Sequence, residues 1–372
     1  MKKNITILPG DGIGPEVVNQ GIKVIEAVNS VFNHEFKLQE ALIGAVSIDA
    51  TGKAITSKAL DQCEGSDAVL LGAIGDPKYD NNPALKVRPE QGLLKLRKTL
   101  ELFSNIRPIS TYDILKDVSP LKERLLENVD LVIYRELTGG IYFGEKTLSD
   151  DKNTATDLCT YTSHEISRIA YQAFEAANSR RKKLTLVDKA NVLETSRLWR
   201  RVVQDISLEY PEVEVDYMFV DNAAMQVMLN PSSFDVILTE NMFGDIISDL
   251  ASVITGSLGM LASASVGNKT AMFEPIHGSY PQAKGLDIAN PMATILSVAM
   301  MYEHFKLHEE ANLIKNGVAW AIENGILTQD IAGDSEVHSC SKVGDMIACF
   351  IEEQGVVEMK NDSIKMSQNC II

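Results

Sequence analysis

Short apolar runs alternate with amphipathic segments along this chain, and that alternation constrains the fold more than any other feature. Residues such as Val18, Ile22, Ile25 and Val28 recur at the spacing of one helix face. Strands that alternate with helices predict an α/β protein with a mostly parallel sheet. The runs expected to form strands are Ile5–Leu8, Ala68–Ile74, Asp130–Arg135, Leu184–Val187, Val213–Val220, Phe234–Leu238 and Thr270–Phe273.

The first strand leads into a glycine-rich turn, ILPGDGIGPEVV at residues 7–18, in the order of a dinucleotide-binding fingerprint. The third glycine of G-x-G-x-x-G would fall at position 15, which is Pro15. No acidic residue with a clear ribose role lies on a strand about 20 positions later. Because proline suits the first turn of a helix, we expect an α/β fold that is not a Rossmann fold.

The composition limits the class of protein. The 372 residues suit two domains, and 45% hydrophobic with 23% charged residues is an ordinary soluble composition without a membrane-spanning run. A formal net charge of -16 argues against nucleic acids and anionic membranes as partners. We expect a cytoplasmic protein with reduced thiols, since the N-terminal apolar stretch is too short for a signal peptide. The scattered cysteines are Cys63, Cys159, Cys340, Cys349 and Cys370.

Two carboxylates four residues apart give the sharpest chemical signal. Asp245 and Asp249 lie in the helical segment FGDIISDLAS after the strand Phe234–Leu238, and such residues are about 5–6 Å apart at Cβ. Ligands of open α/β sheets bind at strand ends, and oxygen ligands favour Mg²⁺ or Mn²⁺ over zinc. Asp221 ends another strand and is a third candidate. A solvated surface pair is the alternative reading of the two helical acids.

An acidic chain that binds an anionic substrate needs a local cluster of cations. Arg97, Arg107 and Arg135 are the candidates, because bidentate guanidinium contacts can hold two carboxylates. Lys189 follows the strand Leu184–Val187 and becomes a workable base if a nearby cation depresses its pKa. Each of these cations alone is more often a surface residue.

Other polar groups carry weaker signals. Tyr142 follows a Gly-Gly turn, and Asn191 follows Lys189 in VDKANVLE. The run His277-Gly278-Ser279 offers backbone donors and a hydroxyl to a phosphate, although a plain loop is the more common meaning of such a run.

Taken together, these motifs resemble those of the β-decarboxylating dehydrogenases, the isocitrate and isopropylmalate dehydrogenase family. The resemblance implies metal-dependent oxidative decarboxylation of a 2-hydroxy diacid with reduction of a nicotinamide cofactor. It covers about residues 4–350 and leaves the tail beyond residue 352 without a role. The motifs, in family order, are LPGDGIGPE, LLGAIGDPKYD, GLLKLRKTLELFSNIRP, RELTGGIYFGE, DKANVLE, NMFGDIISDLAS, FEPIHGSYP and DIANPMATILS.

The resemblance also implies a role for each candidate. Asp245 and Asp249 would hold Mg²⁺ or Mn²⁺ together with Asp221 of a partner subunit, so the chain would form an obligate homodimer. Lys189, also from the partner, would take the substrate's hydroxyl proton. Tyr142 would return a proton to the enolate that remains after CO₂ leaves. The residues expected to bind the substrate's carboxylates are Arg97, Arg107 and Arg135.

Within the family, the segment from Glu90 to Arg97 decides the substrate. Isocitrate dehydrogenases carry a serine and an asparagine there, whereas this chain has Leu93 and Leu94. An apolar pocket favours an isopropyl branch and leaves a third carboxylate desolvated. The resemblance thus implies conversion of (2R,3S)-3-isopropylmalate to 2-oxoisocaproate in leucine biosynthesis. D-malate, tartrate or homoisocitrate are alternative substrates, and a non-catalytic regulatory subunit is a remote alternative.

One position departs from the family pattern. NAD-using relatives commonly read HGSAPD, whose aspartate holds the adenosine ribose, whereas this chain reads HGSYPQ with Gln282 at that place. NADP-using relatives place a lysine and a tyrosine there, and this chain has neither, so we expect NAD. The residues expected at the cofactor are Ile13, Glu90, Asn191, Glu274, His277, Gly278, Ser279, Gln282 and Asn290.

The resemblance finally implies a discontinuous organisation. A cofactor-binding domain would comprise residues 1–103 and 256–372, and a central domain for substrate, metal and dimerisation would comprise residues 104–255. The main cofactor loop would be Glu274–Asn290, and the N-terminal glycine-rich turn would border the cofactor through Ile13.

Overall fold

A computed structural model describes residues 1–80 and 85–369, with side chains as far as Gln354 apart from Asp80. The chain divides into two compact units, of which unit 1 is Met1–Leu96 with Met272–Ile372 and unit 2 is Arg97–Ala271. The prediction of a free thiol at Cys370 lies outside the described residues. The cysteines within them, Cys63, Cys159, Cys340 and Cys349, are all free.

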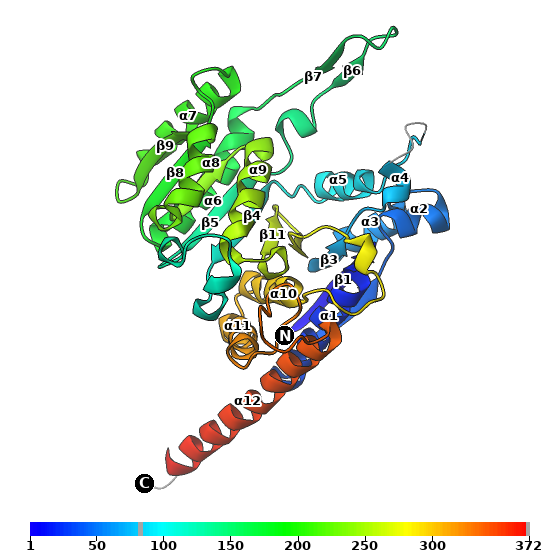
Figure 1. Cartoon of the computed structure of the whole chain (residues 1–372), viewed down its shortest axis with the longest axis vertical. Helices are drawn as coiled ribbons and strands as arrows, with labels where there is room; N and C mark the ends of the chain where they lie inside the picture. Colours follow the sequence, from blue (N-terminus) through cyan, green and yellow to red (C-terminus); the bar gives the residue numbers. More distant parts are fainter. Residues whose placement is uncertain (81–84, 370–372) are drawn as a thin grey trace. The chain divides into compact units, whose positions relative to one another are not determined.

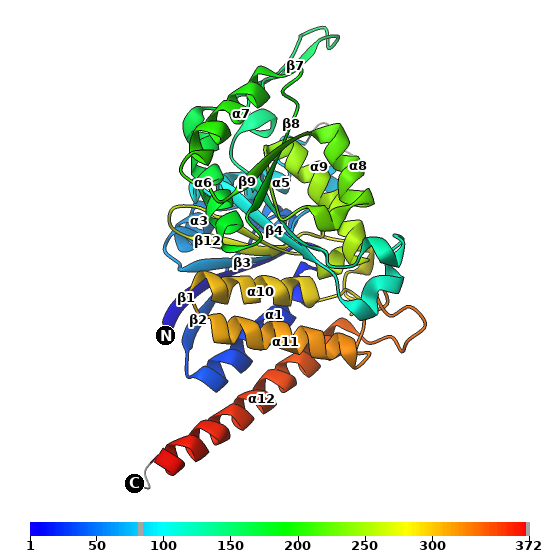
Figure 2. The ribbon, with the colours of Figure 1, turned by 90° about the vertical axis from the view of Figure 1, so that its left-hand side faces the viewer.

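Unit 1 contains strands in the order β2-β1-β3-β12, and β1 pairs in parallel with both β2 and β3. Helix α1 contacts α10 and α12, and Figure 2 shows α10 and α11 side by side. The strands are β1 Lys2–Gly10, β2 Glu35–Glu40, β3 Ala68–Ala73 and β12 Ala271–Pro275. The helices are α1 Gly14–Phe32, α2 Ala45–Thr51, α3 Ser57–Glu64, α4 Pro77–Asp80, α5 Glu90–Thr99 (which crosses into unit 2), the 3₁₀ turn η7 Pro281–Ala283, α10 Met292–His304, α11 His308–Glu323 and α12 Cys340–Asn369.

Unit 2 contains strands in the order β11-β4-β5-β10-β8-β9. The four strands from β5 to β9 in that order pair in parallel, whereas β4 is antiparallel to both β5 and β11. The strands are β4 Ser104–Ser110, β5 Asp130–Glu136, β8 Lys183–Asp188, β9 Glu214–Phe219, β10 Val236–Thr239 and β11 Ala262–Val266. The α-helices are α6 Ser163–Ser179, α7 Glu194–Ser207, α8 Val220–Leu229 and α9 Asn241–Ala251.

Short elements complete unit 2. An antiparallel pair, β6 Lys146–Leu148 with β7 Ala155–Asp157, extends away from the rest of this unit as a fully exposed arm (Figure 1). The 3₁₀ turns are η1 Asp113–Val118, η2 Glu123–Leu125, η3 Gly140–Tyr142, η4 Pro231–Ser233, η5 Ser252–Thr255 and η6 Leu258–Met260.

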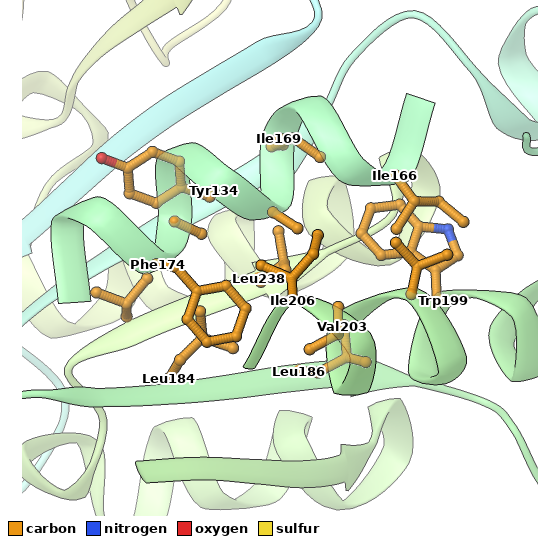
Figure 3. Close-up of a cluster of buried hydrophobic side chains, with 14 of the residues drawn as sticks. Tyr134, Ile166, Ile169, Phe174, Leu184, Leu186, Trp199, Val203, Ile206 and Leu238 are labelled. Carbon is orange, nitrogen blue, oxygen red and sulfur yellow. The ribbon is translucent and has the colours of Figure 1, made fainter. Parts of the chain in front are cut away.

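The core of unit 2 forms where α6 and α7 pack on the parallel strands. Figure 3 shows Phe174 of α6 close to Leu184 of the sheet, and Trp199 of α7 close to Ile166 of α6. These side chains are almost completely buried, and each contributes about 1.5–3 kcal/mol to folding by leaving water. The core holds the strand ends, from which the polar side chains of this unit extend, in fixed positions.

The predicted α/β architecture with a mostly parallel sheet is confirmed, and each expected strand is present with shifted ends. Helix α6 ends at Ser179, directly before the basic run Arg180–Lys183. The two arginines that follow bind Asp235 instead of the helix end: Arg180 Nε donates to Oδ1 and the backbone N–H of Arg181 donates to Oδ2, at 2.8 and 2.9 Å. No helix among the described residues has the length and apolarity to cross a membrane.

Candidate active site

Two buried arginines on neighbouring strands form the centre of a polar cluster in unit 2. Arg107 lies on β4 and Arg135 on β5, and their residues are 6% and 3% exposed. Arg107 donates from Nε to Asn105 Oδ1 at 2.6 Å and from Nη1 to Ser248 Oγ at 2.5 Å. Arg135 donates from Nε and Nη2 to the carbonyl and side-chain oxygens of Asn241, each at 2.9 Å. Both guanidinium groups are therefore fixed in orientation.

Helix α9 brings the two predicted carboxylates to these arginines. Asp245 accepts a hydrogen bond from Arg135 Nη1, and its Oδ1 is 3.9 Å from Arg107 Nη2. Asp249, one turn later, accepts from Arg107 Nη1 at 3.4 Å. Gly244 lets the helix approach so closely, because a Cβ atom there would lie 2.5 Å from Arg135 Cγ. Both acids thus contact buried cations, while the Asp249 side chain remains 66% exposed and that of Asp245 35% exposed.

Tyr142 joins the same cluster from the turn η3. Its hydroxyl donates to Asp245 Oδ2 at 2.9 Å, and Arg135 Cζ lies 5.9 Å from the ring centroid. The Gly-Gly turn before it packs on Tyr161, where a Cβ at Gly140 would lie 2.2 Å from the hydroxyl oxygen, and Gly140 has a φ of 72°. Glycine is needed here for both space and backbone conformation.

Burial shifts the pKa values of this cluster. Burial, and then the charge of Arg135, lower the pKa of Arg107 to about 10, so its guanidinium remains charged at neutral pH. Burial likewise lowers the pKa of Arg135 and raises the pKa of Tyr142 and of Asp249. Arg97 contributes to both arginine shifts through its charge. The three arginines therefore concentrate positive charge in an acidic chain, as an anionic substrate requires.

Lys189 and Asp221 form a second cluster at the ends of the parallel strands β8 and β9. Lys189 Nζ donates to Asp221 Oδ1 at 2.8 Å, and this bond lowers the pKa of the carboxyl. Asn191 is exposed in the turn that follows. Within the described part of a single chain, no three Asp, Glu, His or Cys side chains lie close enough to hold a metal ion. Within one chain, Asp221 therefore lies apart from Asp245 and Asp249, the other two acids expected to bind the metal.

In unit 1 the glycine-rich turn packs against the loop predicted to bind cofactor. Ile13 N donates to the Ser279 carbonyl at 2.8 Å, and a Cβ at Gly12 would lie 1.9 Å from that oxygen. Glu16 accepts from the backbone N–H of Gly285 and, at 3.1 Å, from that of Asp287. Pro15 occupies the first turn of α1, as predicted. The turn therefore supports the loop, and its acid, Asp11, is structural.

Asp11 is buried and accepts three backbone N–H groups at 2.8 to 2.9 Å, those of Ala45, Val46 and Gly75. Near Gly75, Glu90 Oε1 and Ser279 Oγ each lie 3.5 Å from the position that a Cβ would occupy. The structure therefore brings Glu90 and Ser279, two of the predicted cofactor residues, to one glycine.

The remaining candidates in this loop differ in environment. His277 Nδ1 lies 3.0 Å from the Gly278 carbonyl, and burial lowers the pKa of the imidazole. Asn290, which precedes the N-cap residue Pro291 of α10, accepts from Met292 N at 3.0 Å and donates to Asp330 at 3.1 Å. Glu274 is buried at the end of β12, Gly278 is exposed, and Gln282 is exposed in η7.

Helix α5 carries the residues predicted to choose the substrate. Glu90, Leu93, Leu94 and Arg97 are spaced by three or four residues, so they share one side of the helix. Leu93, Leu94 and Arg97 are half-buried. An apolar pair therefore lies one turn before a cation, which suits a ligand with one branched apolar end and one carboxylate.

The sequence did not predict the uncharged polar residues that orient the two arginines and fix the start of α9. Asn105, two positions before Arg107 on a strand, points to the same face, and that spacing was the available signal. Asn241 and Ser248 gave no comparable signal. Tyr161 accepts from Asn241 N and donates to Glu240 Oε2, both at 3.0 Å, and so fixes the start of α9.

Comparisons with known proteins identify the family of this chain. The isocitrate/isopropylmalate dehydrogenase profile matches residues 4–347. The 3-isopropylmalate dehydrogenase of Bacteroides fragilis is 51% identical over 354 residues, covering 95% of this chain and 100% of its own. That of Bacillus subtilis is 46% identical over 363 residues, covering 96% and 99%. The isocitrate dehydrogenase structure from Methylococcus capsulatus aligns with a TM-score of 0.84 at 34% identity, covering 94% and 99%. This chain therefore belongs to the isocitrate/isopropylmalate dehydrogenase family.

Proposed function

We propose that this chain is an NAD-dependent enzyme that oxidatively decarboxylates (2R,3S)-3-isopropylmalate to 2-oxoisocaproate and CO₂ in leucine biosynthesis. The observation that carries the proposal is the pairing of buried Arg107 and Arg135 with the two acids of α9, in a chain whose 46–51% identical relatives are 3-isopropylmalate dehydrogenases. Buried guanidinium groups favour a dicarboxylate, and adjacent acids favour a divalent cation.

Leu93 and Leu94 support the choice of substrate within the family. Burying an isopropyl group against two leucines is favourable, whereas the third carboxylate of isocitrate would lose its water without gaining a partner. D-malate and tartrate lack the branch and gain less from such a pocket. They remain the alternative substrates, together with homoisocitrate.

The chain's own groups perform the binding and proton-transfer steps. Arg97, Arg107 and Arg135 hold the substrate's carboxylates and orient its C2 hydroxyl. Lys189 of the second subunit accepts the hydroxyl proton as C2 loses its hydride. Tyr142, whose pKa is raised by burial, still carries its proton at neutral pH and donates it to C3 after CO₂ has left. Protonation at this carbon completes the reaction.

The donor set fits Mg²⁺ or Mn²⁺. Asp245 and Asp249 offer carboxylate oxygens one helical turn apart, and both ions prefer such ligands. Asp221 of a second subunit would complete the set. A bound divalent ion supplies positive charge that polarises the oxygen at C2.

Unit 1 supplies the residues proposed for NAD. They are Ile13, Glu90, Glu274, His277, Gly278, Ser279, Gln282 and Asn290. Asn191 is a further residue that we propose for NAD. NAD held by these residues would supply the hydride acceptor. An uncharged Gln282 gives a 2′-phosphate no cation to bind, so NAD is favoured over NADP. We assign cofactor binding to residues 1–103 and 256–372, and substrate binding and dimerisation to residues 104–255.

A homodimer with shared sites accounts for the separation of Lys189 and Asp221 from the acids of α9. Apolar side chains on α8 and α9 support a subunit interface, because Met225, Leu229 and Ile246 are 56%, 62% and 56% exposed in the single chain. The free cysteines fit the reducing environment of the cytoplasm, where we place the enzyme.

The proposal is tested by following NADH formation with purified protein, 3-isopropylmalate and Mg²⁺, with NADP and chelator in parallel assays. We expect turnover with NAD that stops when the metal is removed, and much weaker turnover with NADP. A regulatory subunit would show no metal-dependent turnover with any substrate, and that outcome would contradict the proposal.

A further inference from the structure

Arg107 and Arg135 differ from other arginines of unit 2 in the type of side chain that orients them. Arg107 donates a hydrogen bond to the side chain of Asn105, and Arg135 donates one to the side chain of Asn241. Both asparagines are 0% exposed. An amide oxygen fixes the orientation of a guanidinium group without neutralising its charge.

Three other arginines of this unit are paired differently. Arg180 binds Asp235 at 2.8 Å, Arg200 binds Asp188 at 2.5 Å, and Arg168 binds Glu136 at 3.3 Å. Each of those carboxylate side chains is at most 3% exposed. In each of these three pairs a buried acid therefore neutralises the arginine.

Each amide is held with its oxygen toward the arginine. Asn105 Nδ2 donates to Ser265 Oγ at 3.1 Å and to the Ala264 carbonyl at 3.4 Å, on β11. Asn241 Nδ2 donates to the Gly139 carbonyl at 3.1 Å. Since a carbonyl oxygen accepts only, these contacts define which end of each amide faces the guanidinium.

We propose that Asn105 and Asn241 are positioning residues that orient Arg107 and Arg135 with neutral acceptors, so that both guanidinium charges stay available to the substrate's carboxylates. The inference rests on the proposed function, because it takes those arginines as the carboxylate-binding groups. Asp245 and Asp249 also contact these arginines, and a divalent ion held by the two acids would compete for their oxygens and so leave the guanidinium charges available.

Replacing Asn105 by aspartate gives the sharpest test. The variant Asn105→Asp keeps an acceptor for Arg107 Nε and makes it a carboxylate, but it loses the amide's donation to Ser265 Oγ and to the Ala264 carbonyl. The ion pair formed would neutralise Arg107 and offset part of this loss. We expect KM for 3-isopropylmalate to rise about tenfold or more, because one charge contact in a partly buried site is lost, while kcat changes little and Tm falls less than in Asn105→Ala.

Two further variants separate charge from structure. Asn105→Ala removes the acceptor, so both Tm and KM should worsen. Asn178→Asp makes the same charge change on the exposed surface of α6 and should alter neither constant. If Asn105→Asp matches the wild type in KM while Asn105→Ala loses stability, Asn105 serves only the fold and the inference is overturned.

A binding measurement keeps this test separate from the identity of the substrate. The rise in Tm on adding 3-isopropylmalate or D-malate with Mg²⁺ is measured for each variant without cofactor. We expect either diacid that stabilises the wild type to stabilise Asn105→Asp much less. Stabilisation by D-malate alone would count against the proposed substrate but would still test Asn105, and equal stabilisation of both proteins would overturn the inference.

Discussion

The hydroxyl of Tyr142 donates a hydrogen bond to Oδ2 of Asp245 over 2.9 Å, while Oδ1 of the same carboxylate accepts from Arg135. One acid thus connects the proposed proton donor to an arginine proposed to bind substrate. Burial, followed by the charge of Asp245, raises the pKa of Tyr142. The phenol therefore holds its proton at neutral pH, as a general acid requires.

Replacing Tyr142 by phenylalanine should slow turnover while preserving binding. Loss of a positioned general acid costs on the order of a hundredfold in rate, and we expect kcat to fall by about this factor with little change in KM for substrate. Steady-state NADH formation measures both constants. Tyr171→Phe is the matched control, since Tyr171 is also 37% exposed and donates to a carboxylate, that of Glu209, at 2.8 Å. Similar effects of the two changes would contradict the assigned role.

A methyl group at position 244 should disturb Arg135. The Cβ atom of Gly244→Ala would lie 2.5 Å from Arg135 Cγ, and relieving such a clash costs about 1–3 kcal/mol. We expect a lower free energy of unfolding in denaturant titrations and a higher KM for substrate. Gly65→Ala is the control, because its Cβ would meet its nearest neighbour at 3.4 Å and its φ is -84°. An unchanged KM in Gly244→Ala would show that Arg135 tolerates displacement.

Mixing two inactive variants tests the shared site. Lys189→Ala and Asp245→Asn should each be inactive as homodimers, because every site lacks one essential group. In a mixed dimer with shared sites, one site carries both defects and the other carries none. Random pairing should then restore roughly a quarter of wild-type activity, since half of the dimers are mixed and each has one intact site. Co-expression with two affinity tags isolates the mixed dimer, and its complete inactivity would place each site within one subunit.

Gln282 offers a test of cofactor choice. An aspartate at this position could accept hydrogen bonds from both ribose hydroxyls, and a charge-assisted bond is worth about 1.5 kcal/mol or more. We expect Gln282→Asp to lower KM for NAD about tenfold and to weaken any use of NADP. Gln282→Ala should leave KM for NAD nearly unchanged. A rise of KM in the aspartate variant would mean that the ribose binds elsewhere.

The sequence predicted elements whose pattern is local. Apolar runs located the buried parallel strands, and Pro15 located the start of α1. Strand β4 was not predicted, because Ser104–Ser110 mixes polar residues with Pro108, which has no N–H to donate. Its pairing with β5 and β11 is a tertiary property. Strand β2, at the edge of the sheet, was also not predicted, because most of its residues are polar.

The charged residues of the site were predictable from the sequence, but the uncharged residues that orient them were not. Asp245 and Asp249 were recognisable from their spacing on one helix, and the structure brings them to Arg107 and Arg135. Asn241 carries no such pattern, since a single asparagine is compatible with many environments. Asn241 contacts Arg135 only because α9 packs against β5, and a short stretch of sequence does not reveal that packing.

The most direct test of the proposed function compares kcat/KM for 3-isopropylmalate, D-malate, homoisocitrate and isocitrate with NAD and Mg²⁺ in one preparation. The pocket attributed to Leu93 and Leu94 predicts the highest value for 3-isopropylmalate, by at least about tenfold, because burial of the extra methyl groups stabilises its transition state. A higher value for D-malate, or for either substrate with a third carboxylate, would contradict that pocket and with it the assigned substrate.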